Sequence, residues 1–292
     1  MSEFVMITAF MSNINQRGDR DIEKYVDLGY KLLDVNIRQI VFIERRVFER
    51  YFRLRYQGFP RIFGREVSYE NTECCVDASV PKILTFPYEY IVLGHITFVF
   101  FEKTDMYFHA HRDTITEFSV NTPHPTKDTL DYMFVQCHKT EWVSLAIRLD
   151  EVAYENKSFT YAWVDFGIRH MFPSDIACDM ELYQLRDRIT RSGASYSKVF
   201  APSCWNPNCV YYQDVYRNIM WVFAGSVFGG NADVLCEFAR RTKEKCLGII
   251  REKRHLMWEV NVWYMVFQDC RELFALYHGD HNASILRECC LP

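Results

Sequence analysis

Short apolar runs alternate with stretches of helical periodicity in the first part of the chain. Residues 4–10 (Phe-Val-Met-Ile-Thr-Ala-Phe) and 39–43 (Gln-Ile-Val-Phe-Ile) are predicted to form buried strands. Each is followed by a segment with apolar residues at helical spacing, over 21–34 and 47–56. This order of strand, helix, strand and helix is typical of the opening of a parallel α/β sheet.

The rest of the chain continues the pattern. We expect a strand over 91–101, a helix over 126–149 that Thr126 can cap, and a strand over 159–164. Further predicted elements are helices over 179–191, 232–253 and 257–273, a proline-containing loop at 202–207, a glycine-rich turn at 224–230 and a polar tail at 277–284. Since no repeat or linker interrupts the chain, the sequence predicts one Rossmann-like α/β domain over residues 1–292, with a mostly parallel central sheet flanked by helices.

Composition narrows the class of protein. Hydrophobic residues make up 49% of the 292 residues and aromatic residues 16%, which allows a large core and argues against global disorder. A net charge of −4 lacks the basic excess of a dedicated nucleic-acid binder. No apolar run approaches the ~20 residues of a membrane span. The start of the chain also lacks the features of a signal peptide, so we expect a cytoplasmic protein without a membrane span.

The cysteines do not follow a metal-binding or disulfide pattern. There are 11 of them, an odd number with irregular spacing, and no CxxC pair occurs. A structural zinc site of the usual kind therefore lacks support. We expect free thiols in a reducing compartment.

One carboxylate stands out against this background. The run Phe159-Thr-Tyr-Ala-Trp-Val reads as a buried strand, and it ends in Asp165 with Gly167 two positions later. A carboxylate at the carboxyl end of a strand in an open α/β sheet points into the crevice where ligands bind. A lone buried carboxylate is costly unless it is paired, hydrogen-bonded or bound to a metal. The alternative is an aspartate that only caps the following turn.

Two tripeptides have the appearance of protein-kinase motifs, His111-Arg-Asp113 and Asp165-Phe-Gly167. A kinase catalytic loop needs an asparagine five residues after its aspartate, and Phe118 stands there instead. No G-x-G-x-x-G loop occurs near the start, and no A-P-E follows the second motif. The sequence thus excludes a protein kinase.

Several segments share one further pattern, and together they span nearly the whole chain. They are Ile7-Thr-Ala-Phe10, Asp131-Tyr-Met133, His138-Lys-Thr-Glu141, Ala162-Trp-Val-Asp-Phe-Gly-Ile168, Trp221-Val-Phe-Ala-Gly225, Phe228-Gly-Gly230, Trp258-Glu259 and Leu276-Tyr-His-Gly-Asp280. In this order they resemble the YibB/HtrL family of bacteria and large DNA viruses. That family is similar to glycosyltransferases of the GT-A type, which have a single Rossmann-like domain and commonly use a divalent metal.

The resemblance implies a nucleotide-sugar-dependent glycosyltransferase. It would move a sugar from a UDP- or GDP-linked donor to a hydroxyl group of a glycan acceptor. The family resemblance further implies Mn²⁺ or Mg²⁺ as cofactor, held by Asp165 and by His278, because many GT-A enzymes return a carboxy-terminal histidine to the metal. Asp280 and His281 are neighbours that could serve instead. The chain departs from the GT-A pattern in having one acid where D-x-D is usual.

The same resemblance suggests roles for other residues. Lys139 would neutralise a donor phosphate, with a solvated helix lysine as the alternative. Residues in and after the first strand would also bind the donor, because loops at strand ends build nucleotide sites in such sheets. The expected donor-binding residues are Thr8, Ala9, Phe10, Arg17, Lys139 and Asp165.

Glu259 is the candidate general base. It is flanked by Trp258 and Trp263, and apolar surroundings make a carboxylate a stronger base. Deprotonation of the acceptor hydroxyl by Glu259 implies inversion at the anomeric carbon. A helix-start glutamate stabilised by the helix dipole is the alternative. Trp221 and Gly225 are the expected acceptor-binding residues.

Two other functions stay open at this level. The missing second acid fits a catalytically silent protein that binds a sugar nucleotide or glycan. A nucleotidyltransferase could use the same strand-end aspartate.

Overall fold

The computed structural model describes residues 3–12, 21–56, 61–63, 86–118, 127–154, 157–192, 196–207 and 214–287. The described strands form one nine-stranded sheet in the order β3-β4-β5-β2-β1-β6-β8-β7-β9. Only β4 and β8 among them run against the others, which confirms the predicted mostly parallel α/β sheet. The strands are β1 (Glu3–Phe10), β2 (Arg38–Ile43), β3 (Arg61–Phe63), β4 (Tyr90–Leu93), β5 (Ile96–Phe100), β6 (Phe159–Val164), β7 (Val199–Ser203), β8 (Val227–Asn231) and β9 (Phe274–His278).

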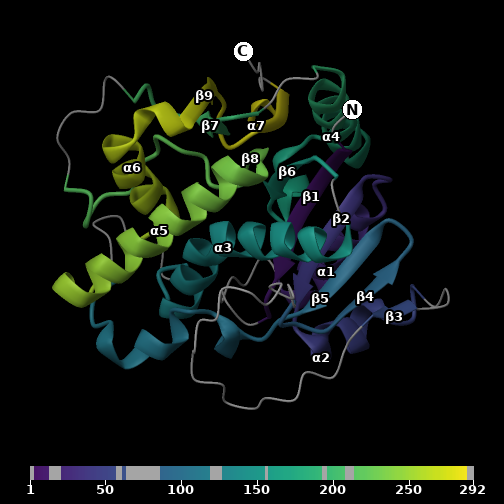
Figure 1. The fold of residues 1–292 in the computed structure, drawn as a ribbon, viewed down its shortest axis with the longest axis horizontal. Coiled ribbons are helices and arrows are strands. Elements are labelled where there is room, and N and C mark those ends of the chain that lie inside the picture. The colour runs from purple at the N-terminus through teal and green to yellow at the C-terminus, as the bar shows by residue number, and fades with distance from the viewer. Residues whose placement is uncertain are drawn as a thin grey trace, which may run out of the picture.

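Helices cover both faces of the sheet (Figure 1). The apolar side chains of α3, α5 and α6 form a core on one face, and those of α1, α4 and α7 pack on the other. No helix in the described part of the chain is long and apolar enough to cross a bilayer. The helices are α1 (Ile22–Leu33), α2 (Arg45–Val47), α3 (Leu130–Ala153), α4 (Asp175–Ser192), α5 (Ala232–Lys253), α6 (Glu259–Asp269) and α7 (Ser284–Arg287), with short turns η1 (Phe48–Phe52), η2 (Lys103–Asp105), η3 (His109–Thr114), η4 (Ile168–Met171) and η5 (Arg271–Leu273).

Strand β1 lies at the centre of the sheet and is buried on both faces. Val5 and Ile7 join the core under α3, whereas Phe4 and Met6 join the core under α4. This alternation follows from the two-residue period of a strand. β1 pairs in parallel with β6, with Ile7 opposite Trp163. The carboxyl ends of β1 and β6 therefore meet at one edge of the sheet.

Helix α1 is fixed beside that edge. Asp21 caps the helix by accepting a hydrogen bond from the backbone N–H of Lys24 at 2.9 Å. Gly29 lies against Phe166, and a Cβ at Gly29 would stand 1.9 Å from the Phe166 ring. The glycine inside α1 is thus explained by the close approach of the residue that follows Asp165. Phe166 also stacks on Phe10 with ring centroids 4.9 Å apart.

Two predicted irregular segments are strands. The glycine-rich segment predicted as a turn contains most of β8, and the predicted proline loop contains the last two residues of β7. β8 needs glycine because a Cβ at Gly229 would lie 2.3 Å from Phe200 and 2.4 Å from the Tyr161 carbonyl oxygen. Pro202 is tolerated because it lies beyond the paired position of β7 and β8, which joins Phe200 to Gly229.

Several predicted boundaries also change. The single strand expected over 91–101 is a hairpin of β4 and β5, turned at Gly94 with φ of 63°. The helix expected from residue 126 begins at Leu130, with Thr129 as its cap. The helix expected over 47–56 starts two residues earlier and continues as a π turn to Phe52. The predicted polar tail holds the end of β9 and the start of α7.

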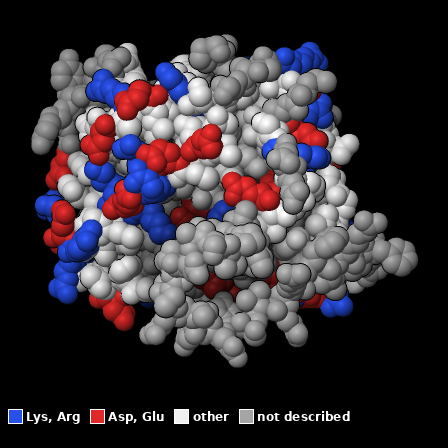
Figure 2. Space-filling model, in the orientation of Figure 1, with Lys and Arg blue, Asp and Glu red and all other residues white. Residues whose placement is uncertain are grey.

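Charged side chains of both signs alternate over helix α5. On the face shown in Figure 2, blue and red groups intermix at the left, where α5 lies in Figure 1. Arg240 on α5 contacts Glu237 and Glu244, each at 2.7 Å. Such (i, i+3) and (i, i+4) pairs stabilise an exposed helix. This helix does not present the one-sign basic surface that recognises nucleic acid.

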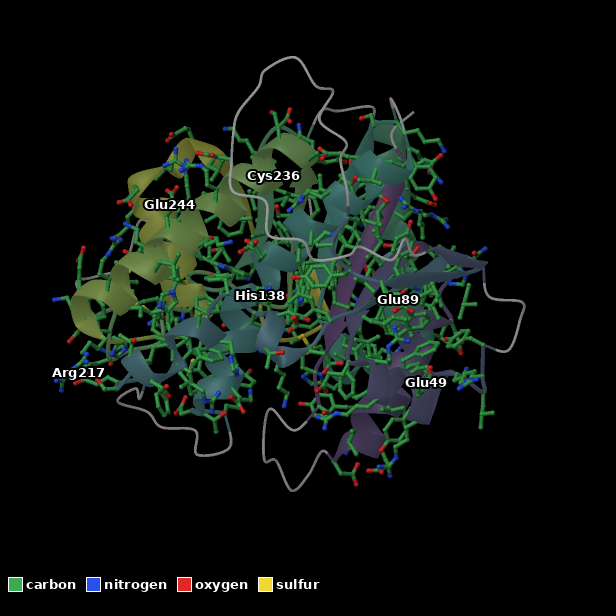
Figure 3. The ribbon with its side chains drawn as sticks, turned by 60° about the horizontal axis from the view of Figure 1, so that its bottom comes forward. Glu49, Glu89, His138, Arg217, Cys236 and Glu244 are labelled. Carbon is green, nitrogen blue, oxygen red and sulfur yellow. The ribbon has the colours of Figure 1, made fainter. Side chains whose placement is uncertain are left out.

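His138 on α3 is buried among aromatic rings in the core, 1% exposed (Figure 3). Its ring centroid lies 4.9 Å from that of Trp142 and 5.4 Å from that of Phe101. Neither ring nitrogen has a hydrogen-bond partner within the described residues. Burial, aided by the charge of Lys243, lowers the pKa of His138 from 6.5 to about 3.

The lowered pKa of His138 makes the stability of the folded protein depend on pH in the acidic range. Between pH 6.5 and about 3 the unfolded chain binds a proton at His138 that the folded chain does not bind. The free energy of unfolding is therefore expected to fall as the pH drops through this window, by up to about 1.4 kcal/mol per pH unit from this group. Urea denaturation at several pH values measures this slope. His138→Phe should have a smaller slope, and an unchanged slope would contradict the prediction.

Candidate functional site

A cavity of about 450 Å³ opens at the carboxyl ends of β1 and β6. This size lies in the usual range for small-molecule sites, and the position is the one where α/β sheets bind ligands. Seven of the residues predicted from sequence line it together with other residues. They are Ala9, Phe10, Lys139, Asp165, Trp221, Gly225 and Glu259.

Three charged side chains meet at the base of this cavity, and we call them the carboxylate–lysine cluster: Lys139, Asp165 and Glu259. The ammonium of Lys139 lies 3.0 Å from Asp165 Oδ1 and 3.1 Å from Glu259 Oε1. It also donates to the Gly225 carbonyl oxygen at 2.9 Å. The Lys139 and Glu259 side chains are only 3% and 4% exposed, whereas that of Asp165 is 30% exposed. Asp165 is thus the member of the cluster that a ligand reaches first.

All three N–H donors of the Lys139 ammonium are already hydrogen-bonded within the protein, so none is directed at a donor phosphate. A lysine ammonium offers three N–H donors, and Asp165, Glu259 and the Gly225 carbonyl accept from all three. Burial is the largest influence on its pKa and opposes the charge, but Asp165 and then Glu259 outweigh burial and raise the pKa of Lys139 above its usual value. The lysine therefore stays charged and positions the two carboxylates, which differs from its predicted direct contact with the donor.

Gly225 leaves the space that Glu259 occupies. A Cβ at Gly225 would lie 2.2 Å from Glu259 Oε1, closer than any side chain permits. Glu259 is the first residue of α6, and its Oε2 atom has no hydrogen-bond partner among the residues that the structure describes. Oε2 is itself buried, and a buried carboxylate oxygen without a partner is an unsatisfied hydrogen-bond acceptor. The absence of a side chain at Gly225 therefore makes room for the Glu259 carboxylate.

Asp165 is held in place by Trp163 of β6 and by Ser226, which precedes β8. The indole N–H of Trp163 donates to Asp165 Oδ1 at 2.7 Å, and the backbone N–H of Asp165 donates to the Ser226 carbonyl at 2.9 Å. Trp163 also stacks on Trp142 of α3, with ring centroids 5.8 Å apart. Asp165 does more than cap the following turn, because its carboxylate contacts Lys139 and Trp163.

Aromatic rings form one wall of the cavity. Trp221 packs edge-on against Trp258 at 6.0 Å and against His281 at 4.6 Å between ring centroids. The Trp258 indole N–H donates to Asp128 at 3.0 Å, which fixes this ring beside Glu259. Tryptophan faces offer large apolar area at low entropic cost.

The predicted donor-binding residues divide between the cavity and its surroundings. Ala9 and Phe10 line the cavity. Thr8 is fully buried, and its hydroxyl has no hydrogen-bond partner in the described ranges. It is not part of the cavity wall. Arg17 lies outside the described residues.

The structure does not bring His278 to Asp165. His278 ends β9 with an exposed side chain and is not part of the cavity wall, whereas the preceding Tyr277 points into the core. His281, three residues later, lines the cavity instead. The alternation of a strand at Tyr277 and His278 decides this outcome.

The described surroundings of Asp165 do not fit a Mn²⁺ or Mg²⁺ site. These ions require several oxygen ligands. Asp165 Oδ1 already accepts from Trp163 and Lys139, and Oδ2 contacts the same ammonium at 3.3 Å. Within the described residues no group of three histidine, cysteine, aspartate or glutamate ligands includes Asp165. A divalent ion bound there would have an ammonium as its neighbour.

Sequence reasoning missed several residues of the cavity wall. Lys127, Asp21, Tyr25 and His170 line it together with the predicted residues. Lys127 stands just before the Thr129 cap of α3, and its ammonium lies 5.8 Å from the Trp258 ring centroid. Its position before a helix start was a usable signal, since such segments lie at the edge of the sheet.

The chain was compared with family models and with curated proteins. No family model matches it, and no curated protein matches it. The resemblance to the YibB/HtrL family therefore rests on the motifs of the sequence alone.

Proposed function

We propose that the protein is a glycosyltransferase that moves a sugar from a UDP- or GDP-linked donor to a hydroxyl group of a glycan acceptor. The observation that carries this proposal is the carboxylate–lysine cluster at the base of an aromatic-walled cavity. It provides a partly exposed carboxylate and, beside it, a buried carboxylate with one unpartnered oxygen. In the proposed reaction one carboxylate binds substrate hydroxyls and the other acts as general base.

Glu259 is the proposed base. Its carboxylate, which lines the cavity, takes the proton of the acceptor hydroxyl as the acceptor oxygen bonds to the anomeric carbon. The bond from that carbon to the diphosphate oxygen breaks at the same time, and the diphosphate leaves with the electron pair. Attack from the side opposite the leaving group inverts the anomeric centre. Lys139 orients Glu259 through its contact with Oε1.

The other residues of the cavity bind and orient the substrates. Asp165 accepts hydrogen bonds from donor hydroxyls through its exposed side. Lys127 also lines the cavity and is the proposed contact for the diphosphate. Trp221 and Trp258 offer apolar faces to the acceptor sugar. No step runs through a metal.

A panel of nucleotide sugars tests this function. Thermal-shift measurements with UDP- and GDP-sugars, with and without Mn²⁺, are expected to show stabilisation by a nucleoside diphosphate sugar. Incubation of the protein with that donor is expected to release the free nucleoside diphosphate slowly, by hydrolysis. Binding without hydrolysis or transfer would identify a silent sugar-nucleotide binder. Preference for a nucleoside triphosphate would identify a nucleotidyltransferase.

Asp165→Asn tests the donor contact. We expect the donor Kd to rise roughly 10- to 100-fold, because hydrogen bonds to a charged group contribute about 1.5–3 kcal/mol. Isothermal calorimetry measures this change. The matched control is Asp187→Asn, which alters an exposed ion pair on α4 and should leave the donor Kd unchanged. Equal affinity of Asp165→Asn and wild type would remove Asp165 from the donor site.

A further inference from the structure

A second group of ligand-type side chains lies where β7 and β9 end. Cys204 directly follows β7, and Asp280 and His281 follow β9. The parallel pairing of these strands places Ser203 opposite His278, and the Gly279 N–H donates to the Ser203 carbonyl at 3.2 Å. The pairing of β7 with β9 thereby brings Cys204 close to His281, although the two residues are 77 positions apart in the chain.

The distances from His281 to the other two side chains match those between the ligands of a tetrahedral metal ion. His281 Nδ1 lies 3.7 Å from Cys204 Sγ and 3.3 Å from Asp280 Oδ1, and one ligand atom from each residue falls within 4.8 Å of the other two. With Zn–S near 2.3 Å and Zn–N or Zn–O near 2.0 Å, tetrahedral geometry separates a thiolate from an imidazole by about 3.6 Å and an imidazole from a carboxylate by about 3.3 Å. The side chains need to move little to bind an ion.

We propose that Cys204, Asp280 and His281 bind Zn²⁺. A set of one sulfur, one nitrogen and one oxygen ligand is suited to zinc, whereas Mg²⁺ and Ca²⁺ prefer sites built from oxygen alone. The site is separate from Asp165, which is not a member of the group. With three protein ligands, the fourth position is left for water or for an oxygen of a bound molecule.

The surrounding structure orients these ligands. The edge-on contact with Trp221 holds the His281 ring, and His281 also lines the main cavity. The turn is fixed by hydrogen bonds from the His281 N–H to Asp280 Oδ1 at 2.6 Å and from the Asp280 N–H to Ser284 Oγ at 3.0 Å. The ion would therefore lie beside the main cavity, since His281 lines it whereas Cys204 and Asp280 do not.

Metal binding must displace the thiol proton. In the metal-free protein, burial and then Asp280 raise the pKa of Cys204 to about 12, so the thiol is protonated at neutral pH. Zinc binding releases this proton to solvent and forms the sulfur–metal bond. The site differs from the cysteine-rich structural zinc sites that the sequence argues against, because it uses a single cysteine.

The experiment uses the full chain, stripped of metal with a chelator and then titrated with Co²⁺ and Zn²⁺. We expect one equivalent of Co²⁺ to bind with a cobalt–thiolate charge-transfer absorption band, and Zn²⁺ to displace it. Zn²⁺ is also expected to protect Cys204 from alkylation, which peptide mass spectrometry measures residue by residue. No charge-transfer band, or a Cys204 that reacts equally fast with and without Zn²⁺, would overturn the proposal.

Variants separate this site from the other cysteines. His281→Ala keeps every cysteine, yet its Kd for Co²⁺ is expected to rise more than about tenfold, with loss of the protection of Cys204. Asp280→Asn serves as a second variant, and thermal melting without metal checks that both fold. Cys236→Ser, which changes another partly buried thiol among the described residues, is the control that should bind metal as wild type does. Wild-type affinity in both His281→Ala and Asp280→Asn would refute the site. None of these measurements depends on sugar transfer.

Discussion

Replacing Lys139 with methionine is expected to lower the free energy of unfolding by about 3–5 kcal/mol, because it leaves buried carboxylate charge without its partner. Glu259 is 4% exposed and pairs with Lys139 at 3.1 Å, and Asp165 would lose the same partner. Chemical denaturation at neutral pH measures the change. The control is Lys157→Met, which removes an exposed pair with Glu3 at 3.5 Å and should cost about 1 kcal/mol or less.

The pH dependence and a double variant sharpen this prediction. The pKa of Lys139 is raised by the carboxylates despite burial, so its stabilising contribution is fully present below its usual value of 10.5 and is lost as the pH rises through the higher folded value. Lys139→Met with Glu259→Gln should regain part of the lost stability, since one uncompensated charge is removed. A Lys139→Met protein as stable as wild type would show that the cluster is not a buried charge network.

Glu259→Gln is expected to lower kcat by about 10²- to 10⁴-fold, the usual contribution of a general base. The amide oxygen can still accept from Lys139 in place of Oε1, so the fold and the donor Kd should change little. Single-turnover transfer assays measure the chemical step. Glu244→Gln on the exposed face of α5 is the matched control. Full turnover by Glu259→Gln would require a base elsewhere in the cavity.

The central half of the fold could be predicted from periodicity. β1, β2 and β6 are apolar runs buried on both faces, and helices α1 and α5 follow polar caps at Asp21 and Asn231. Strand β8 could not be predicted from its residues, because Gly229 and Gly230 have low strand propensity. Glycine is required there by Phe200, which belongs to a different strand. Such a requirement is visible only once the strands are paired.

For the candidate site too, the sequence predicted the individual residues but not the contacts between them. Asp165, Lys139 and Glu259 were each identified by local pattern and family resemblance, but with separate roles. Their mutual contact depends on the packing of α3 and α6 against the end of β6, and Lys139 and Glu259 are 120 residues apart. Local sequence also could not distinguish His278 from His281, because His281 reaches the cavity from the turn after β9, and the place of that turn is fixed by the pairing of β9 with β7.

The hydrogen bond from Trp163 to Asp165 should make the intrinsic tryptophan fluorescence sensitive to ligands in the cavity. Three of the six tryptophans, Trp163, Trp221 and Trp258, line the cavity. The Trp163 indole N–H shares its acceptor carboxylate with Lys139, so a ligand that draws on Asp165 changes the polarity felt by this ring. Intrinsic fluorescence should therefore follow cavity occupancy in real time without a label, and association rates can be measured on the unmodified chain.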